Sequence, residues 1–284
     1  MEYIMLLFIG LIAGTVGSLV GLGGGIIIVP LLIGLHSLSP QLAVGTSMVT
    51  VVFTGLSSTL TYMKHKRVDY KSGLILFIGS GPGGIIGSWA NKFLNQDTFS
   101  LYFGIFLIFV SILLMLRDKL KPLSLSNMTV IKRSFTDNEG NTVHYQFPPL
   151  LAIFIAFIVG FISGLFGIGG GALLVPAMML LFAFPAHIAV ATSMFIVFLS
   201  AIVSSATHIS LGNVSWIYAL ILIPGAWIGG KIGAYINTKL SGKAVINLLR
   251  ITLIILGTRL IITSFYNAFL LECVFLIRMN IKTS

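Results

Sequence analysis

Charged residues are scarce in this chain. They make up 8% of its 284 residues, whereas hydrophobic residues make up 57%. Ordinary soluble domains carry roughly a quarter of charged residues, so this sequence cannot build a water-facing surface of normal polarity. Runs of about 20 apolar residues are what a helix needs to cross the hydrocarbon of a bilayer. The composition therefore predicts an integral membrane protein.

Acidic residues are rarer still. The seven carboxylates all lie in loops or at the ends of apolar segments: Glu2, Asp69, Asp97, Asp118, Asp137, Glu139 and Glu272. Pumps and cation transporters normally keep an acidic residue at membrane depth. The lack of an acidic residue at membrane depth favours an anionic or neutral substrate. It also means that no residue is an obvious proton carrier for coupled transport.

The sequence also lacks the residues of several other classes of protein. The single cysteine, Cys273, excludes an internal disulfide and a cysteine metal cluster, and no histidine pair has metal-ligand spacing, so we expect no metal and no cofactor. There is no phosphate-binding Gly-x-x-x-x-Gly-Lys-Ser/Thr motif, and the serines lack histidine and acid partners at membrane depth. We therefore expect no enzymatic activity.

The chain does contain two copies of one unit. The glycine motif at 21–25 recurs at 167–171, 146 positions later, and a Val-Pro pair follows each copy. Between 17–91 and 163–237 there are 26 identities in 75 aligned positions. The sequence is therefore an internal duplication, and each copy can be compared with the other.

Each copy contains four apolar segments long enough to cross a membrane. They are 3–20, 41–63, 71–91 and 98–116 in the first copy, and 149–166, 187–209, 214–236 and 244–266 in the second. The first segment lacks the basic region and cleavage site of a signal peptide, so we expect a membrane helix. A shorter apolar segment follows each glycine motif, at 24–36 and 170–184. Whether these two span or re-enter the membrane stays open.

Loop charges predict that the two copies have opposite orientation. Loop 64–71 carries four basic residues against one acid, its counterpart 209–213 carries no charge, and the bias reverses in the next pair of loops. Basic residues mark the cytoplasmic side, and an odd number of segments in each copy also requires inversion. The expected fold class is an all-α integral membrane protein of two inverted-topology repeats of about five helical segments each, with short or re-entrant glycine-broken helices.

The domain organisation follows from this plan. We assign 1–116 to transmembrane repeat 1, 117–148 to a polar cytoplasmic connector, 149–266 to repeat 2 and 267–284 to a C-terminal tail. Within the connector, the run 137–141 has the composition of a turn before a short strand, so a hairpin and a flexible link both stay open. The net charge of +10 lies in loops and flanks, where topology and lipid headgroups account for it, so we expect no nucleic-acid partner.

The glycine motifs are candidate ligand sites. Contiguous glycines allow φ > 0 and close approach of a ligand, and a helix is expected to begin directly after each motif, at about Ile26 and Ala172. Helix N-termini favour anions, and helix breaks in corresponding places of two inverted halves predict a midplane site. Packing of helices is the alternative. We favour packing for the later glycines, Gly79, Gly83, Gly87, Gly225, Gly229 and Gly233.

Repeated hydroxyls extend the candidate site. The predicted substrate-binding residues are Gly23, Gly24, Gly25, Thr46, Ser47, Gly169, Gly170, Gly171, Thr192 and Ser193. A further set of hydroxyl residues either lines a permeation path or forms hydrogen bonds between helices: Thr54, Ser58, Thr61, Ser200, Ser204 and Thr207. Trp227, Arg250 and Arg259 lie at membrane depth and are further candidates for lining the path. His208 lies near a segment end and is interpreted as an interfacial histidine.

The doubled pattern resembles a known family. Gly-x-Gly-Gly-Gly-x-x-x-Val-Pro, then Ala-Val-x-Thr-Ser and a later Gly-Gly-x-x-Gly, occurs once in each half and is similar to the TauE/SafE family of bacterial membrane transporters, also called the sulfite exporter or toluenesulfonate permease group. The resemblance implies a multi-pass protein of the bacterial inner (plasma) membrane that moves a small sulfur oxyanion or organosulfonate, such as sulfite, a sulfonate or sulfoacetate. It also implies that the glycines and the Thr-Ser pairs line the path.

The resulting prediction is a secondary transporter or exporter of a small anion that works by alternating access of two inverted repeats. The alternative is an anion channel, or a membrane scaffold whose glycines only pack helices. The expected partners are a small anionic substrate and the lipid bilayer, and assembly into a homo-oligomer stays open.

Overall fold

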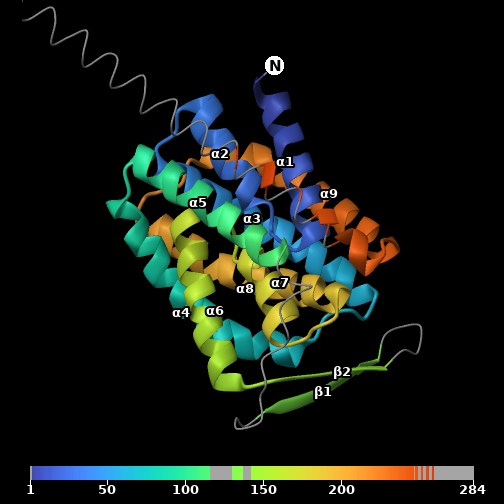
Figure 1. Ribbon diagram of the computed structural model, residues 1–284. Coiled ribbons are helices and arrows are strands. Elements are labelled where there is room, and N and C mark those ends of the chain that lie inside the picture. The colour runs from blue at the N-terminus through green and yellow to red at the C-terminus, as the bar shows by residue number, and fades with distance from the viewer. Residues whose placement is uncertain are drawn as a thin grey trace, which may run out of the picture.

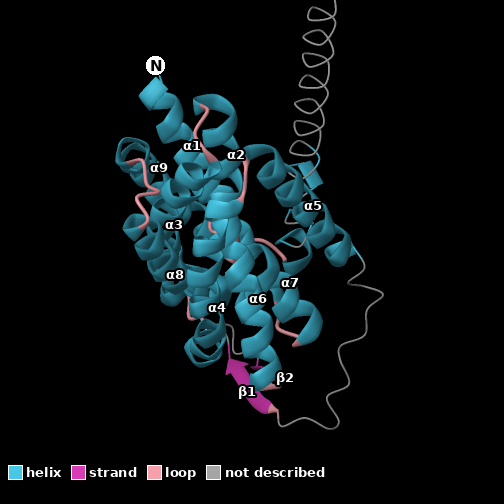
Figure 2. Ribbon diagram, turned by 90° about the vertical axis from the view of Figure 1, so that its left-hand side faces the viewer, coloured by secondary structure: helices cyan, strands magenta, loops and turns pink. Residues whose placement is uncertain are grey.

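The protein is a bundle of helices with one β-hairpin at one end (Figures 1 and 2). The computed structural model describes residues 2–115, 130–136 and 142–245, with six more positions between 247 and 258. In chain order the elements are α1 (Glu2–Val20), α2 (Gly25–His36), α3 (Pro40–Lys64), α4 (Tyr70–Ala90), the 3₁₀ turn η1 (Asn91–Phe93), α5 (Gln96–Met115), β1 (Ile131–Thr136), β2 (Thr142–Phe147), α6 (Pro149–Phe166), α7 (Gly171–Leu181), α8 (Ala186–Ser210) and α9 (Trp216–Lys239).

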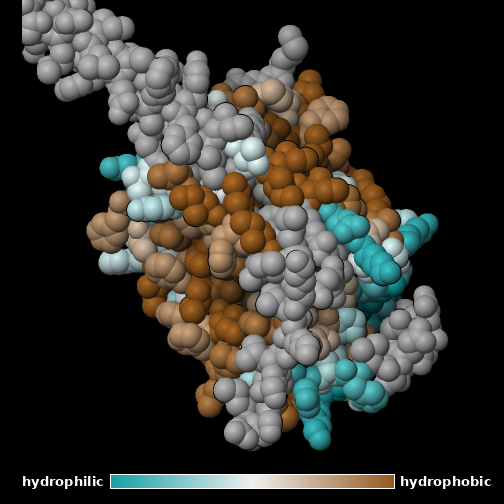
Figure 3. All heavy atoms as spheres, in the orientation of Figure 1, coloured by the Kyte–Doolittle hydropathy of each residue, from teal (hydrophilic) through white to brown (hydrophobic). Residues whose placement is uncertain are grey.

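Six of the described helices are long and apolar enough to cross a membrane: α1, α3, α4, α6, α8 and α9. The outside of the bundle is correspondingly apolar. Large hydrophobic side chains such as Phe154 and Leu220 are more than half exposed, and Figure 3 shows hydrophobic residues over most of the face that it presents. The structure therefore confirms the predicted all-α, multi-pass membrane fold. The predicted segment 98–116 forms α5, and most of 244–266 lies outside the described residues.

The helices after the glycine motifs are half-length. α2 has 12 residues and α7 has 11, about 18 Å of helix at most, whereas the hydrocarbon core is about 30 Å thick. Both begin within one residue of the predicted start, at Gly25 and Gly171. Neither α2 nor α7 is therefore long enough to cross the hydrocarbon core by itself.

Helices from the two copies pack across each other. α1 lies along α9 and α6 lies along α4, while α3 and α8 contact each other in the centre. With the offset of 146 residues, α1 corresponds to α6 and α4 corresponds to α9. The first helix of each copy therefore packs against the helix that follows the central helix of the other copy.

Glycine makes this close packing of helices feasible. A Cβ built at Gly79, Gly83 or Gly87 would overlap a backbone carbonyl oxygen of α6, and one built at Gly225, Gly229 or Gly233 would overlap a carbonyl oxygen of α1. Small residues that let two backbones approach are the usual means of association between membrane helices. The packing interpretation of these six glycines is confirmed.

The connector contains an antiparallel hairpin, so the hairpin interpretation is confirmed. Alternation along β2 places Tyr145 and Phe147 inward, where both are buried, and leaves His144 exposed. The ring of Tyr145 packs 4.1 Å from that of Phe184, just after α7, and its hydroxyl donates to Asp69 Oδ2 at 2.5 Å. The hairpin and loop 64–71 therefore lie at the same end of the bundle, as the predicted topology requires.

We predict that Tyr145→Phe loosens the hairpin. The substitution removes a buried hydrogen bond to a carboxylate, worth about 1.5–3 kcal/mol, and should increase hydrogen exchange of the β2 amides. His144→Ala, on the exposed face of the same strand, is the matched control and should leave exchange unchanged. Equal exchange in the wild type and Tyr145→Phe would contradict the assignment of this bond as the anchor.

The anchor should also resist alkaline pH. Burial raises the pKa of Tyr145, and the hydrogen bond to Asp69 raises it further. The pKa of Tyr145 is therefore higher in the folded protein than in the unfolded chain. Its contribution to the free energy of unfolding is complete below about pH 10 and is lost only as the pH rises beyond that.

Candidate functional site

The two glycine motifs form matching breaks in the backbone. Gly23 and Gly24 have φ of 82° and 91°, and Gly169 and Gly170 have φ of 86° and 83°. These left-handed conformations are readily available to glycine alone, so a side chain at any of the four would strain the chain. Gly24 and Gly170 are the N-cap residues of α2 and α7, as the contiguous glycines predicted.

The two breaks cross each other in the interior. A Cβ at Gly25 would overlap the carbonyl oxygen of Gly167, and a Cβ at Gly171 would overlap that of Gly21. All of 21–25 and 167–171 is buried. The helix that begins at each break therefore starts in contact with the break of the other copy, and the two helix N-termini lie on either side of this crossing.

The repeated serines form hydrogen bonds at the crossing. Ser47 Oγ donates to the carbonyl oxygen of Gly167 at 3.2 Å, and Ser193 Oγ donates to that of Gly21 at 2.9 Å. These bonds are equivalent under the 146-residue offset. The serines thus contact the glycine motifs through a bond that joins the two copies. Their predicted role in binding a substrate stays a prediction.

The repeated threonines reach the loops at the ends of the bundle. Thr46 Oγ1 accepts from the backbone N–H of Ser215 at 2.9 Å, and Thr192 Oγ1 accepts from that of Asp69 at 3.1 Å. Both threonines are fully buried. Each threonine therefore ties the central helix of its own copy to the loop after the central helix of the other.

A narrow void lies beside the second glycine motif. It is too small to hold a water molecule in this structure and is lined by Gly170, Ser163 and apolar side chains from α5, α6 and α7. Ser163 Oγ is buried there, and it has no hydrogen-bond partner among the described residues. Sequence reasoning missed Ser163, because its counterpart in the first copy is Gly17 and the repeat carries no signal at this position.

The predicted polar stripe bonds mainly within the protein. Thr54, Thr61 and Thr207 donate to carbonyl oxygens one turn earlier in their own helices. Ser58 also reaches Gly230 of α9, and Ser200 pairs with Ser80 of α4. Ser204 Oγ is buried without a partner among the described residues. The stripe faces the seams between α3 and α9 and between α8 and α4.

Of the remaining predicted residues, the structure describes Trp227, which does not join this centre. The side chain of Trp227 is 37% exposed, and its backbone carbonyl accepts from Ser57 at 2.7 Å. Arg250 and Arg259 lie outside the described residues.

The electrostatics of the crossing suit an anion. Asp69, the buried carboxylate of the described part, lies at the end of the bundle and accepts bonds from Tyr145 and Ser72. Within 21–25 and 167–171 there is no ionisable side chain, and the helix N-termini supply partial positive charge. No group of three or more His, Cys, Asp or Glu residues that could hold a metal ion occurs in the described ranges.

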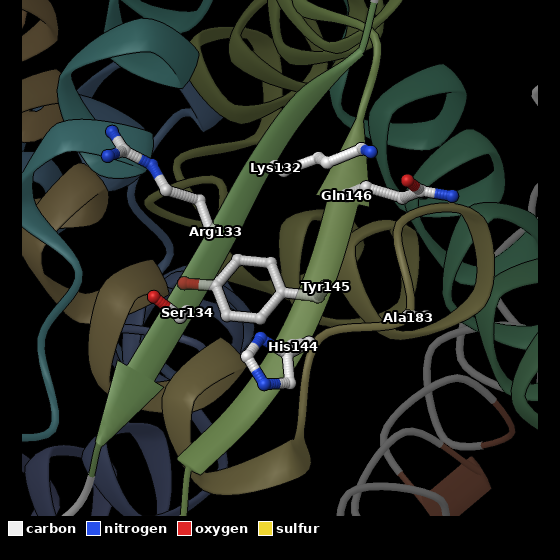
Figure 4. Close-up of a pocket in the computed structure, with 7 residues that line it drawn as sticks. All are labelled: Lys132, Arg133, Ser134, His144, Tyr145, Gln146 and Ala183. Atoms are coloured by element: carbon white, nitrogen blue, oxygen red, sulfur yellow. The ribbon is translucent and has the colours of Figure 1, made fainter.

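A second hollow lies on the hairpin. This open groove of about 570 Å³ is lined by Lys132, Arg133, Ser134, His144, Tyr145, Gln146 and Ala183, and Figure 4 shows Arg133 pointing away from Lys132 and Gln146. The sequence analysis placed no site here, because the basic residues of the connector read as topology signals.

These features define a multi-pass membrane protein built around two crossed, glycine-broken half-helices. The profile of the family described as Sulfite exporter TauE/SafE matches residues 6–260. The chain belongs to this family, a family of membrane transporters rather than a class of enzymes.

Several curated relatives share most of this chain. It is 54% identical to the probable membrane transporter protein YunE of Bacillus subtilis over 92% of this chain and 98% of the relative, and 28% identical to YjnA of the same organism over 91% and 99%. It is 27% identical to the Sulfite exporter TauE/SafE family protein 6 of Arabidopsis thaliana over 59% of this chain and 37% of the plant protein. No solved structure matches.

We predict that Gly25→Ala prevents normal folding. The added methyl group meets the backbone carbonyl of Gly167, which cannot move without shifting the second motif, and overpacking of this kind costs about 1–3 kcal/mol or more. Gly34→Ala in the same helix is the matched control, because nothing lies within 4 Å of the new methyl group. Thermal unfolding in detergent should show a large decrease in the unfolding temperature for Gly25→Ala and none for Gly34→Ala. Equal stabilities would contradict the crossing.

We predict that Ser47→Ala destabilises the fold. The buried carbonyl of Gly167 loses its donor, at a cost of about 1–3 kcal/mol. Thr50→Val is the control, because the hydroxyl of Thr50 donates to the carbonyl oxygen of Thr46 within its own helix and joins no other described element. If thermal unfolding shows no difference between Ser47→Ala and wild type, Ser47 does not fasten the two copies.

Proposed function

We propose that the protein is a secondary transporter or exporter of a small anion, a sulfur oxyanion or organosulfonate such as sulfite. The substrate class is supported by the name of the family and by the absence of an ionisable side chain from the two crossed glycine motifs. Backbone N–H groups at a helix start suit any small oxyanion, so sulfite is the first substrate to test.

The crossing of the glycine motifs is the observation that carries this proposal. Interrupted backbone at membrane depth is tolerated where protein or a watery cavity covers it, and paired breaks in two repeats are typical of transporter binding sites. In the proposed mechanism, N–H groups at the starts of α2 and α7 replace the hydration of the anion. Movement of one copy against the other then exposes the anion to each side in turn.

The proposed location is the bacterial inner membrane. Loop 64–71 and the connector hairpin lie at one end of the bundle, joined by the bond between Tyr145 and Asp69. The basic residues of this loop mark that end as cytoplasmic. The lipid bilayer and the anion are then the partners, and nothing in this proposal requires a homo-oligomer.

The test uses purified protein in proteoliposomes that contain labelled sulfite. Gly170→Ala adds a methyl group to the void beside Ser163, with ordinary contacts only and the nearest at 3.5 Å. Gly212→Ala carries the same backbone strain, since φ is 83° at Gly170 and 71° at Gly212, but it faces open space. We predict equal folding of the two variants and about tenfold slower sulfite exchange for Gly170→Ala alone, a change of about 1.4 kcal/mol.

Saturation of exchange and counterflow in the wild type would support a carrier. Flux that does not saturate would instead favour the channel, and no flux of sulfite or any organosulfonate would favour the scaffold. Equal exchange by the two glycine variants would contradict the placement of the site.

A further inference from the structure

Unpartnered polar atoms gather where the C-terminal parts of α4, α6 and α8 meet. The atoms are Ser88 Oγ, Asn91 Oδ1, Ser204 Oγ and His208 Nδ1, all buried and all without a hydrogen-bond partner among the described residues. Native structures leave few such groups, and each one calls for an explanation. We call these four side chains the His208 cluster.

Gly164 and Leu165 of α6 hold the His208 cluster together. His208 Nε2 lies 3.4 Å from the carbonyl oxygen of Gly164, and Asn91 Nδ2 donates to that of Leu165 at 2.7 Å. A Cβ at Gly164 would lie 2.8 Å from the backbone nitrogen of Ser88, and a Cβ at Gly84, one turn before Ser88, would lie 2.6 Å from Ser204 Oγ. The four side chains therefore surround one short segment.

The bond to Gly164 determines the state of the His208 ring. A carbonyl oxygen can only accept, so in the neutral imidazole Nε2 carries the hydrogen and Nδ1 is a free acceptor. The side chain is fully buried. Sequence reasoning interpreted it as interfacial because it lies near the end of a segment, and the close approach of α6 through Gly164 is what encloses it.

At the positions equivalent to Ser204 and His208, the other copy has polar atoms with partners, although Thr59 Oγ1 between them is buried and unpartnered among the described residues. His208 corresponds to Tyr62, whose hydroxyl donates to the carbonyl oxygen of Ser18 at 2.8 Å. Ser204 corresponds to Ser58, which bonds to Gly230 at 3.2 Å, and Ser88 corresponds to Ala234. A purely structural role is therefore met by a tyrosine in one copy, whereas the other copy holds a titratable ring with a free nitrogen.

We propose that His208 is a proton-binding site that couples anion transport to proton movement. A proton from water on one side binds to Nδ1, and the resulting imidazolium keeps its bond to Gly164. The proton leaves to water on the other side after the conformational change, and no bond between heavy atoms is made or broken. Coupling rests on the proposed transport function, whereas proton binding does not.

Burial of His208 opposes a positive charge on the ring, whereas two features of its surroundings favour one. Ser204 lies one turn earlier on the same face of α8, and its hydroxyl, unpartnered in the described part of the chain, leaves free acceptor capacity on that face. His208 is in the last turn of α8, where the helix dipole favours a positive charge. The cluster contains no carboxylate that would hold the proton permanently.

Few other ionisable groups face this end of α8. None occurs in α6 or α7. At this end, His36 packs 4.9 Å from Tyr218 of α9, and Lys92 lies exposed over Trp89 at 4.1 Å. Helix α1 runs parallel to α9, so Glu2 and Tyr3 at its start also lie toward this end, and Asp97 and Tyr102 belong to α5, which follows η1. The other ionisable residues of the packed elements lie farther toward the opposite end: Tyr62 and Lys64 in α3, Tyr70 and Lys71 in α4, His187 in α8 and Lys231, Tyr235 and Lys239 in α9.

The direct test of proton binding is NMR of the purified wild-type protein with labelled histidine. The His208 signal is assigned by its loss in His208→Gln and is followed between about pH 4 and 9, around the usual histidine range. A titrating signal supports the site. A signal that stays neutral across this range overturns it, whether or not the protein transports sulfite.

The test of coupling uses proteoliposomes with a pH gradient and an internal pH dye. His208→Tyr is the sharpest variant, because the chain already uses tyrosine at the equivalent position 62 to bond a backbone carbonyl. We expect sulfite exchange at equal pH to stay within about twofold of wild type. Sulfite accumulation driven by the pH gradient, and the dye signal that accompanies it, should fall about tenfold or more. A pH gradient can drive accumulation only through a proton that binds differently to the inward-open and outward-open states. His144→Gln, an exposed histidine, is the control.

Gradient-driven accumulation that survives in His208→Tyr would overturn coupling through His208. So would net uptake of sulfite by the wild type with no dye signal. If the wild type moves no sulfite or organosulfonate, the proposed function fails, and the NMR titration still decides whether His208 binds a proton.

Discussion

The structure depends on one close contact, the crossing of two backbones that carry no side chains. Gly25 meets the carbonyl of Gly167, Gly171 meets that of Gly21, and neither place has room for a methyl group. This contact positions α2 and α7, because each begins at the crossing. It also explains why the duplicated motif consists of glycine, since both the left-handed φ values and the close approach require it.

Hydrogen bonds between the copies secure this geometry. Ser47 and Ser193 bond the crossing itself, and Thr46 and Thr192 bond the loops at the two ends of the bundle. Membrane helices gain little from the hydrophobic effect against one another, so close packing and hydrogen bonds between them carry more of the association. The two copies therefore depend on each other for folding, and a movement between them must break or bend these bonds.

The duplication allowed much of the fold to be predicted from the sequence. Alignment of the copies predicted the half-length helices at 25 and 171 to within one residue, and glycines at four-residue spacing indicated close helix packing along α4 and α9. The partner helices, α6 and α1, came from the structure alone. The turn composition at 137–141 was compatible with a hairpin and with a flexible link, and the structure shows the hairpin. Each of these features is local, or repeats with a helical period, so spacing alone reveals it.

The partners of the polar side chains could not be predicted. A serine on a membrane helix bonds to its own backbone or to another helix, and only the three-dimensional arrangement shows that Ser47 does the latter. The burial of His208 and the void beside Ser163 depend on how closely α6 approaches. The predicted roles of the glycines and threonines in binding an anion remain predictions.

The central claim is that the crossed glycine motifs receive the anion. The most direct measurement is an electron cryomicroscopy structure of the full chain in lipid nanodiscs with saturating sulfite. We expect density for the anion in contact with the N–H groups at the start of α2 or α7, next to Gly24 or Gly170. Sulfite bound elsewhere, while the crossing stays packed as it is here, would contradict it.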